Sequence, residues 1–588
     1  MFRTHTCGAL RIEHVGQEVT LSGWVNRQRD HGGLIFIVLR DRWGLVQVVA
    51  SPDTDPEAHA VASAVRGEYV VQVRGTVRRR PDDQVNAEWA TGAVEVEVHE
   101  IKVLNAAQTP PFYIYEDSAV DEALRMRYRY LDLRRAHMQY NMILRHKVVE
   151  FIREYLNARD FLDIETPYLF KSTPEGARDY LVPSRVHPGK FYAMPQSPQQ
   201  LKQLLMVAGY DRYYQIARCF RDEDLRGDRQ PEFTQLDLEM SFVERDDILD
   251  LIEGLFTEMI PAVTPDKRLL SPFPRLSYTE AMARYGSDKP DLRFGMELVD
   301  LTELLRTSGF GVFSRAAEAG GQIKGITAPG CAGYARSQID KLTDIAKAQG
   351  ARGLVTLGFS AKGVKGPAVK YLSEGELAQI AELCEAKEGD LVCIVADTPD
   401  VVAKSLSALR LTFRDRLDLA AKDLMAFGWV LDFPMFEWNE DEQRWDAAHH
   451  PFTMPRPNTY EAMAADPTAV FSDAYDLVCN GYELASGSIR VHDPRIQMDI
   501  FRMLGYSEAE AEARFGHLME AFSYGAPPHG GIAPGIDRLV MLLADADNIR
   551  EVIAFPKSMQ ATDLMADAPA EVSPRQLEEL HLRILKKS

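Results

Sequence analysis

The chain has 588 residues and a formal net charge of -20, with 46% apolar and 26% charged residues. This is the composition of a folded globular protein with several domains. Six cysteines without a C-x-x-C pair argue against a disulfide framework or a structural zinc site and fit a reducing cytosol. No stretch is apolar enough for a membrane span and no cleavable signal opens the sequence, so we expect a cytoplasmic protein.

Residues 1–107 are predicted to form a small β-barrel. Short strands are expected at 19–25, 34–39, 45–50, 69–77 and 94–103, with a helix at 61–67. Five strands with one helix inserted are typical of an OB-fold, which binds single-stranded nucleic acid on a face of the barrel. The negative total charge does not oppose this interpretation, because a basic footprint need only be local.

The predicted barrel carries candidate RNA-binding side chains. Positive charge comes from Arg27, Arg29, Arg78, Arg79 and Arg80. Phe36 offers a ring for base stacking, and Gln47 offers an amide that can contact a base edge. For any one of these residues alone the alternative is that Phe36 belongs to the core and the arginines form a solvated rim.

Residues 108–137 are predicted to be a linker. Pro110 and Pro111 favour an extended start. Residues 125–135 are rich in arginine and tyrosine, which suits contact with the phosphate backbone of an RNA. The alternative is a packed helical hinge, and the sequence leaves both interpretations open.

Residues 138–285 are predicted to combine helices and strands, with amphipathic helices at 143–156 and 244–260. Between these helices, two apolar runs at 213–217 and 233–240 flank a loop dense in arginine and aspartate, which favours an antiparallel hairpin. A loop that alternates both signs of charge is suited to a bound polyanion with a metal. The alternative is a solvated turn with surface ion pairs.

Residues 286–412 have Gly- and Ala-rich turns and no cluster of chemically active side chains, so we expect no catalytic role for this segment. Catalytic patterning resumes over 413–556, where Asp476 and Glu483 flank the turn-forming pair Asn480-Gly481. Two carboxylates brought together across a turn can hold Mg²⁺, whereas exposed acids on a polar hairpin are the alternative. Residues 557–588 are expected to form a C-terminal extension with an amphipathic helix at 573–585.

Three segments occur in a characteristic order. Residues 161–167 (F-L-D-I-E-T-P) close an amphipathic helix, residues 220–223 read F-R-D-E, and residues 530–539 (G-G-I-A-P-G-I-D-R-L) form a Gly-rich strand entering a helix. They resemble motifs 1, 2 and 3 of the class II aminoacyl-tRNA synthetases. Nearly the whole chain resembles the bacterial aspartyl members of the aspartyl, asparaginyl and lysyl subgroup. The resemblance implies a multidomain α+β fold with an OB-fold barrel, an antiparallel sheet flanked by helices, and an inserted α+β domain.

The resemblance also implies an ATP-dependent ligase. The carboxylate of L-aspartate would attack the α-phosphorus of ATP and expel pyrophosphate, and the aspartyl group would pass to the 3′ end of tRNA(Asp). Charging of tRNA(Asn) is left open. No protein nucleophile is required, so the site must align the reactants and neutralise charge. A homodimer is implied as well, with Pro167 at the interface.

Motifs 2 and 3 would supply most contacts with ATP. The implied catalytic residues are Arg221, which would bridge the α-phosphate and the substrate carboxylate, and Arg538, which would cover the adenine or touch the γ-phosphate. Glu223 would accept from the adenine amino group and Phe233 would stack on the ring. Further implied ATP contacts are Asp222, Gln230, Glu483, Gly535, Ile536 and Asp537. The implied Mg²⁺ ligands are Asp476 and Glu483.

An aspartate side chain must meet fixed positive charge, and a neutral isostere would then leave that charge unpaired. By the resemblance, Lys202 and Arg490 supply this charge, with Asp237 orienting the lysine. We therefore expect a positively charged recess beside the nucleotide. The other implied aspartate contacts are Glu175, Gln199, Arg221 and His449.

In the barrel, the resemblance implies that Arg29, Phe36, Gln47 and Glu95 face the anticodon. His31 lies in a loop that, in this family, helps to decide whether tRNA(Asn) is charged in addition to tRNA(Asp). Histidine occurs there in relaxed enzymes and leucine in strict ones. One residue leaves the choice open.

Four rival hypotheses are weighed against the aspartyl one. A lysyl enzyme would need an acidic pocket, which Lys202 and Arg490 oppose, whereas an asparaginyl enzyme is harder to exclude. A tRNA-independent asparagine synthetase would share the catalytic core but would not need the barrel. A pure nucleic-acid-binding protein with a decayed core would not need Arg221, Glu223 and Arg538.

Overall fold

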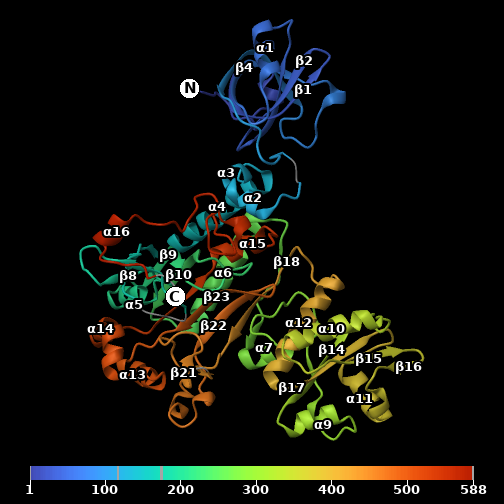
Figure 1. The fold of residues 1–588 in the computed structure, drawn as a ribbon, viewed down its shortest axis with the longest axis vertical. Helices are drawn as coiled ribbons and strands as arrows, with labels where there is room; N and C mark the ends of the chain where they lie inside the picture. The colour runs from blue at the N-terminus through green and yellow to red at the C-terminus, as the bar shows by residue number, and fades with distance from the viewer. Residues whose placement is uncertain (1, 116–117, 173–176, 441, 586–588) are drawn as a thin grey trace. The chain divides into compact units, whose positions relative to one another are not determined.

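The computed structural model describes residues 2–115, 118–172, 177–440 and 442–585. The chain divides into two compact units, Met1–Ile143 with Ile553–Ala570 and Leu144–Val552 with Glu571–Ser588. Elements carry the labels of Figure 1. Among the helices of the described residues, none combines the length and the apolar character needed to cross a membrane.

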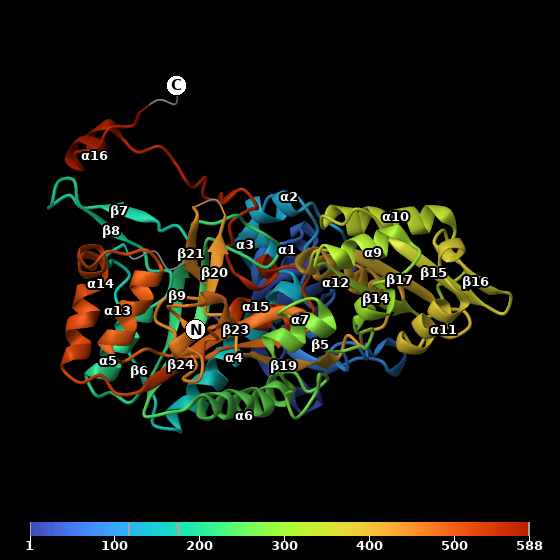
Figure 2. The same ribbon diagram turned by 90° about the horizontal axis from the view of Figure 1, so that it is seen from below.

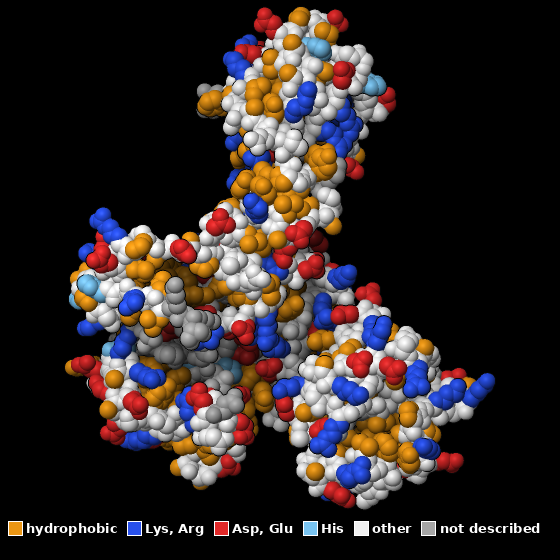
Figure 3. Space-filling view, viewed as in Figure 1, with side chains coloured by type: hydrophobic (Ala, Val, Ile, Leu, Met, Phe, Trp, Pro, Cys, Tyr) orange, Lys and Arg blue, Asp and Glu red, His pale blue; other side chains and the backbone are white. Residues whose placement is uncertain are grey.

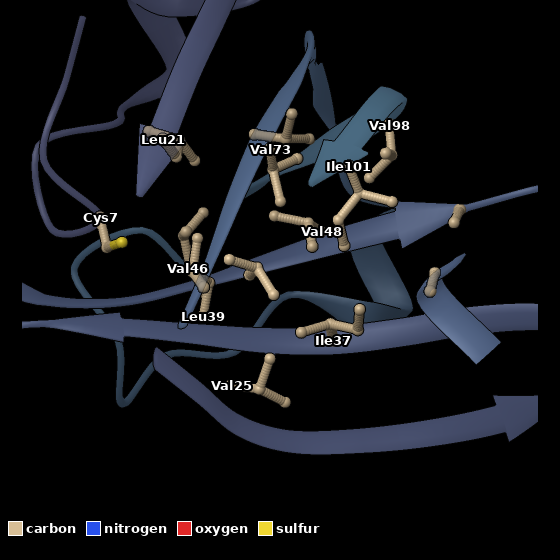
Figure 4. Packing of buried hydrophobic residues seen from close by; sticks show 14 of the residues in the cluster. Cys7, Leu21, Val25, Ile37, Leu39, Val46, Val48, Val73, Val98 and Ile101 are labelled. Carbon is tan, nitrogen blue, oxygen red and sulfur yellow. The ribbon is translucent and has the colours of Figure 1, made fainter. Parts of the chain in front are cut away.

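The first unit contains the predicted closed barrel. Its strands are β1 (Glu18–His31), β2 (Leu34–Asp41), β3 (Gly44–Ala50), β4 (Val70–Arg79) and β5 (Val94–Asn105), hydrogen-bonded in the order β1-β2-β3-β5-β4. Successive residues of a strand face opposite sides, so Ile35 and Ile37 are buried while Phe36 between them is partly exposed. Figure 4 shows aliphatic side chains from the strands meeting inside the barrel. The OB-fold is confirmed.

The helix of the barrel begins earlier than predicted. It is α1 (Pro56–Ala64), whereas the sequence pattern placed a helix at 61–67. Asp55 caps the helix by accepting a hydrogen bond from Ala58 N at 2.8 Å, and Pro56 favours the first helical position. Val65 is already extended. The prediction was wrong because it followed the apolar residues and overlooked the Asp-Pro start signal.

The predicted linker contains two short helices, α2 (Glu122–Arg127) and α3 (Arg129–Asp132). The side chain of Asp132 is fully buried and accepts hydrogen bonds from Arg125 at 2.9 Å and from Arg129 at 2.6 Å. Arg129 also donates to the carbonyl of Ile553 at 2.9 Å. Arg125 and Arg129 therefore belong to a packed helical hinge and are not available to contact an RNA backbone.

An eight-stranded sheet forms the centre of the second unit. In spatial order its strands are β12 (Arg275–Ser277), β19 (Phe427–Leu431), β22 (Ala474–Cys479), β23 (Tyr482–Ile489), β24 (His529–Pro534), β10 (Glu232–Ser241), β9 (Arg212–Phe220) and β6 (Leu162–Asp163). The six central strands are antiparallel, and only the edge strands β12 and β6 pair in parallel. The predicted antiparallel sheet is confirmed.

Helices accompany this sheet. They are α4 (Ala136–Asn157), α5 (Gln199–Val207), α6 (Arg245–Val263), α7 (Tyr278–Tyr285), α13 (Pro494–Met503), α14 (Glu508–Ser523) and α15 (Ile536–Leu543). Figure 2 shows α6 running along one side of the sheet, where Ile248 packs close to Gly530 of β24. Helices α5 and α15 contact β10, the strand that follows the charged loop 221–231.

The inserted segment has a separate five-stranded sheet. Its spatial order is β13 (Val299–Asp300), β14 (Gln322–Ala328), β17 (Leu391–Asp397), β15 (Val355–Ser360) and β16 (Gly363–Lys365). The helices are α8 (Thr302–Leu305), α9 (Gly311–Glu318), α10 (Arg336–Ala348), α11 (Glu374–Leu383) and α12 (Pro399–Arg416). One apolar cluster includes Leu342 and Phe413, and a second includes Phe313 and Ile380, so both faces of the sheet are covered.

Smaller elements complete the fold. They are β7 (Leu181–Pro183) with β8 (Phe191–Ala193), β11 (Arg268–Leu269) with β18 (Leu424–Met425), and β20 (Phe436–Asn439) with β21 (Arg444–Ala447). Short 3-10 helices lie at Ile12–His14, Asp82–Gln84, Val369–Tyr371, Tyr460–Ala462, Pro467–Ala469 and Ile549–Val552. The last helix is α16 (Pro574–Glu579), which Ser573 caps. The expected helix at 573–585 was therefore too long. No residue of α16 is buried, so no packed apolar face stabilises a longer helix.

Candidate active site

The charged loop joins two central strands of the eight-stranded sheet. β9 and β10 pair antiparallel, with Phe220 opposite Glu232, which confirms the predicted hairpin. Because side chains alternate along a strand, Phe233, Gln235 and Asp237 share one face of β10. These three residues line a cavity of about 380 Å³.

Most site residues implied by the resemblance meet in this cavity. They are Gln199, Lys202, Arg221, Glu223, Gln230, Phe233, Asp237, His449, Glu483, Arg490, Gly535, Asp537 and Arg538. Three others are described but do not line the cavity. Ile536 and Asp476 are buried, and Asp222 N donates to the carbonyl of Arg178 at 3.0 Å. Glu175 lies outside the described residues.

Two buried cations converge on one carboxylate at the end of the cavity. Lys202 Nζ lies 2.9 Å from Asp237 Oδ1 and 3.3 Å from Glu239 Oε2. Arg490 donates to Glu239 through Nε at 2.9 Å and through Nη2 at 3.2 Å. All four residues are at most 2% exposed. The structure thus brings Lys202 and Arg490 together from α5 and from the end of β23.

Besides the two cations expected from the sequence, the recess contains two carboxylates. Asp237 and Glu239 lie against Lys202 and Arg490, and burial raises the pKa of Asp237 although Lys202 opposes that shift. Burial opposes ionisation of Glu239, but Arg490 and Lys202 outweigh burial and hold its pKa below the ordinary value. Pairing with buried carboxylates explains how two cations can be buried at all. Recognition of a substrate carboxylate then depends on hydrogen-bond donors that Glu239 does not use.

A neutral histidine completes the partners of Arg490. Nη1 of Arg490 lies 2.7 Å from His450 Nε2 and donates to Ser488 Oγ at 2.8 Å. Burial, followed by the charges of Arg490 and Lys202, lowers the pKa of His450 well below the ordinary value. The neutral imidazole therefore accepts from Arg490. The sequence analysis singled out the neighbouring His449 and missed both His450 and Glu239.

We expect His450 to make acidic pH destabilising. In the unfolded chain it has an ordinary pKa of about 6.5, above its pKa in the fold. The unfolded state therefore binds more protons in acid, and stability falls as pH drops below about 6.5. His450→Gln keeps an acceptor that cannot titrate, so its unfolding midpoint should change less between pH 7.5 and pH 5.5. The control is His146→Gln at an exposed histidine, and equal changes in both variants would contradict the assignment.

Arg221 has a donor that the protein leaves unused. Its guanidinium lies over the ring of Phe233, at 5.1 Å from the centroid. Its Nε is buried, and no hydrogen-bond partner for it occurs in the described part of the chain. A buried donor of this kind costs free energy unless a partner arrives. A phosphate or carboxylate oxygen of a ligand would satisfy it.

Loop residues that the sequence analysis missed hold the other nucleotide candidates. Arg229 Nη1 lies 3.0 Å from Glu223 Oε2. Arg538 Nη2 lies 3.1 Å from Asp228 Oδ2, and its Nη1 donates to the carbonyl of Glu483 at 2.6 Å. The charged loop 221–231 is therefore folded over the cavity by ion pairs and is not simply a solvated turn.

The predicted hairpin of carboxylates exists as β22 and β23. Asn480 and Gly481 form its turn with φ values of 53° and 91°. Glu483 pairs with Val478, and a register shift precedes that pair, so Asp476 lies diagonal to Glu483 and not opposite it. Glu483 lines the cavity, while Asp476 is buried beside His449, with 3.5 Å from Oδ1 to Nε2.

The two carboxylates fit Mg²⁺ only together with further oxygen ligands. Within the described residues, no group of three His, Cys, Asp or Glu side chains is placed to hold a metal alone. Mg²⁺ in nucleotide sites takes one or two carboxylates plus phosphate oxygens and water. Asp476 Oδ1 is buried, and its one polar neighbour among the described contacts, His449 Nε2, is 3.5 Å away, so this oxygen can accept a further partner.

Asp537 connects three elements. Its Oδ2 accepts from Thr234 N of β10 at 2.7 Å, and its Oδ1 accepts from Arg145 of α4. It thereby fixes the start of α15 against the strand that bears the charged motif. This provides a structural role for Asp537 in addition to the ATP contact implied by the resemblance.

In the barrel, the four implied anticodon residues lie on β1, β2, β3 and β5. Arg29 pairs with the partly exposed Phe36 in the register of β1 and β2. Gln47 Nε2 donates to Glu95 Oε2 at 2.6 Å, and Arg80 donates to Gln47 Oε1 at 3.1 Å. An amide held from both ends is suited to reading one base edge. His31 is exposed at the end of β1.

Basic side chains do not cover the molecule as a whole. On the face drawn in Figure 3, acidic and basic side chains are interspersed, in keeping with the net charge of -20. Any nucleic-acid footprint is therefore local, as the composition allowed.

Comparisons with known proteins agree with this geometry. The family described as "tRNA synthetases class II (D, K and N)" matches residues 121–559, and "OB-fold nucleic acid binding domain" matches residues 19–104. The "Aspartate--tRNA(Asp/Asn) ligase" of Rubrobacter xylanophilus is 57% identical over 583 residues, which are 99% of this chain and 97% of the relative. The "Aspartate--tRNA ligase" of Geobacillus kaustophilus is 54% identical over 586 residues, 100% and 99% of the two chains.

The fold has solved counterparts as well. The asparaginyl-tRNA synthetase from Pyrococcus horikoshii, solved with asparaginyl-adenylate, shares 20% identity and a TM-score of 0.60 over 98% of this chain and 100% of that chain. Sheet, cavity and barrel together define a class II aminoacyl-tRNA synthetase. The chain belongs to the D, K and N family of class II tRNA synthetases.

Proposed function

We propose that the chain is an aspartate–tRNA ligase. It activates L-aspartate with ATP to aspartyl-adenylate and pyrophosphate, and then transfers the aspartyl group to the 3′ end of tRNA(Asp). The observation that carries this proposal is the convergence of Lys202 and Arg490 on Glu239 beside the unused donor of Arg221. The names of the relatives from Rubrobacter xylanophilus and Geobacillus kaustophilus support it.

The aspartate side chain would take the donors that remain on Lys202 and Arg490. Nη2 of Arg490 carries two N–H groups, and its hydrogen bond to Glu239 uses one of them. A carboxylate accepts from both cations, whereas the amide nitrogen of asparagine would place a donor against a donor. Gln199 and Glu175 are proposed to hold the substrate ammonium, and His449 to close over the bound aspartate.

The nucleotide would lie between the loop 221–231 and α15. Arg221 would satisfy its free Nε on the α-phosphate and the substrate carboxylate, which aligns the two reacting groups. Arg538 and Phe233 would bracket the adenine, and Glu223 would accept from its amino group. Asp476 and Glu483 would hold Mg²⁺, which supplies positive charge to the phosphates when bound.

The chain is proposed to work as a cytoplasmic homodimer with tRNA as its partner. By the resemblance Pro167 would lie at the dimer interface, and it follows the exposed edge strand β6 in the chain. An edge strand leaves backbone groups unpaired, and pairing with a second copy would satisfy them. The barrel would carry the anticodon contacts through Arg29, Phe36, Gln47 and Glu95.

Two rivals can be separated from this proposal by their substrates. A lysyl enzyme would need anionic groups free to meet an ammonium, but Glu239 and Asp237 are already engaged with Lys202 and Arg490. A tRNA-independent asparagine synthetase would form an adenylate without binding tRNA. Aminoacylation of purified tRNA(Asp) therefore distinguishes the ligase from the synthetase.

We further infer that the enzyme charges tRNA(Asn) in addition to tRNA(Asp). Relatives named for both tRNAs and the exposed His31 support this. Replacing His31 with leucine should shift the ratio of kcat/KM values toward tRNA(Asp) by about fivefold, or roughly 1 kcal/mol, because the leucine cannot hydrogen-bond to a base. Aminoacylation of both tRNAs side by side measures the ratio.

The same variant carries its own control. Pyrophosphate exchange without tRNA should stay at the wild-type rate, because His31 lies in the barrel. An unchanged ratio of the two tRNAs would remove His31 from the account, and failure of the wild type to charge tRNA(Asp) would refute the proposed function.

A further inference from the structure

Both junctions of the inserted segment meet at one turn of the catalytic sheet. The first junction, at 286–296, contains the buried Asp291. The second follows α12 and contains the short strand β18 (Leu424–Met425). The turn is Asn480-Gly481, which joins β22 to β23. The sequence analysis found no role for the inserted segment, so this meeting point is its clearest link to the site.

The first junction contacts the turn through Asp291. Its carboxylate lies 2.7 Å from Arg293 Nη2 and 3.0 Å from Arg414 Nη1, and the residue is 1% exposed. A Cβ added to Gly481 would lie 3.6 Å from Asp291 Cβ and 4.0 Å from Arg414 Nη1. The turn is therefore in van der Waals range of this ion cluster, and its φ of 91° favours glycine.

A second buried arginine of α12 fixes the chain around Asp291. Arg410 Nη2 donates to the carbonyls of Asp291, Phe294 and Gly295, each at 2.9 Å. Its guanidinium also lies over the ring of Phe294, 3.9 Å from the centroid. At 2% exposure Arg410 meets backbone dipoles in place of water, so the first junction is rigidly attached to the inserted helix.

The second junction is held by the side chain of Asn480. Its Oδ1 accepts from Ala426 N at 3.0 Å, and its Nδ2 donates to the carbonyl of Leu424 at 3.0 Å. Asn480 is 6% exposed, so both bonds are shielded from water. One turn is thus attached to the chain that leaves the sheet and to the chain that returns to it.

Glu483 follows Gly481 by two residues and lies on the side of the cavity proposed for the nucleotide. Its backbone carbonyl accepts from Arg538 Nη1 at 2.6 Å, and its side chain lines the cavity. A shift of the turn would therefore move the backbone that anchors Arg538. A shift of the turn should affect the aspartate side of the cavity less, because Lys202 and Glu239 lie on α5 and β10 and Arg490 follows the far end of β23.

We infer that the junctions of the inserted segment form a clamp, made of Asp291, Arg410, Arg414 and Asn480, that positions Glu483 and Arg538 for ATP. The inserted segment is then a support of the nucleotide site and not an appendage without influence on it. This inference rests on the proposed function, since it assigns the clamp to the ATP half of that reaction. The four residues are positioning residues, and none of them lines the cavity among the described residues.

The test uses two variants that loosen the clamp from different sides. Asp291→Asn removes the charge that Arg414 and Arg293 share, and Asn480→Gly removes both hydrogen bonds to the second junction while tolerating the positive φ. Lys404→Ala is the control, because Lys404 lies on α12 but, among the described residues, pairs only with the exposed Asp400. Aspartate-dependent pyrophosphate exchange is measured in the full-length protein, together with the unfolding midpoint.

The KM for ATP should rise about fivefold or more in both clamp variants, while the KM for aspartate stays within about twofold of the wild type. A merely structural role would lower the amount of active enzyme and leave both KM values unchanged. Unchanged KM for ATP, or an equal rise for both substrates, in folded variants overturns the inference. If Asp291→Asn does not fold, Asn480→Gly alone decides between these outcomes. No exchange in the wild type would instead refute the proposed function.

Discussion

Replacing Arg490 with lysine should lower kcat/KM for aspartate by on the order of 10³, or about 4 kcal/mol. The guanidinium donates in four directions, two of them to the buried Glu239 and the others toward Ser488 and His450. A lysine ammonium cannot reproduce this fork, so the charge of Glu239 would lose its bidentate partner. Lys202 would then be drawn toward Glu239 and away from the substrate.

The matched control is Arg495→Lys. Arg495 lies a few residues along the same segment, but its side chain is exposed and pairs only with Asp493 among the described residues. Aspartate-dependent pyrophosphate exchange should be normal in this variant. A fall of less than about tenfold for Arg490→Lys would show that Glu239 does not depend on the fork.

The second large effect is expected for Arg221→Ala, which should reduce kcat of pyrophosphate exchange by about 10² to 10³. Its guanidinium lies at the cavity over Phe233 and has a buried Nε without a hydrogen-bond partner in the described chain. Charge develops on the α-phosphate in the transition state, so the loss should appear mainly in kcat. A nucleotide could still stack on Phe233, and ATP binding should weaken less than turnover.

Arg226→Ala provides the comparison for Arg221. Arg226 is exposed in the same charged loop, so its loss changes net charge without touching the cavity. Equal effects of the two substitutions would mean that the loop acts through its overall charge. A rise in the KM for ATP with unchanged kcat in Arg221→Ala would mean that Arg221 contributes to ground-state binding alone.

Much of the fold could be predicted from local signals. Period-2 alternation identified the barrel strands, and the apolar runs on either side of residues 221–231 identified the β9–β10 hairpin. Asn480-Gly481 identified the β22–β23 turn. The errors occurred where capping decides: the Asp55-Pro56 start of α1 was overlooked, and the terminal helix was extended past Glu579.

The site was predicted less completely, because its balance of charge depends on long-range pairing. The resemblance supplied Lys202 and Arg490, but it did not supply Glu239, on which both cations converge. Glu239 follows Asp237 by two residues, so both side chains lie on the same face of β10. The alternation of side chains along a strand could therefore have identified Glu239 as a site residue. The contacts of Asp228 and Arg229 across the charged loop follow from tertiary folding and have no sequence signal.

The linker shows the same limit. Its arginines and tyrosines have the composition of an RNA-binding surface, yet Arg125 and Arg129 turn inward onto Asp132. Composition alone cannot distinguish an arginine that waits for a phosphate from one that neutralises a buried aspartate. The distinction required the position of Asp132, which is set by the packing of α2 and α3.

The most direct test of the account is amino-acid-dependent pyrophosphate exchange by the full-length protein with aspartate, asparagine and lysine in parallel. Donors from Lys202 and Arg490, held in place by Glu239, predict exchange with aspartate and at most a trace with the other two. Exchange with asparagine or lysine in the absence of exchange with aspartate would contradict the account.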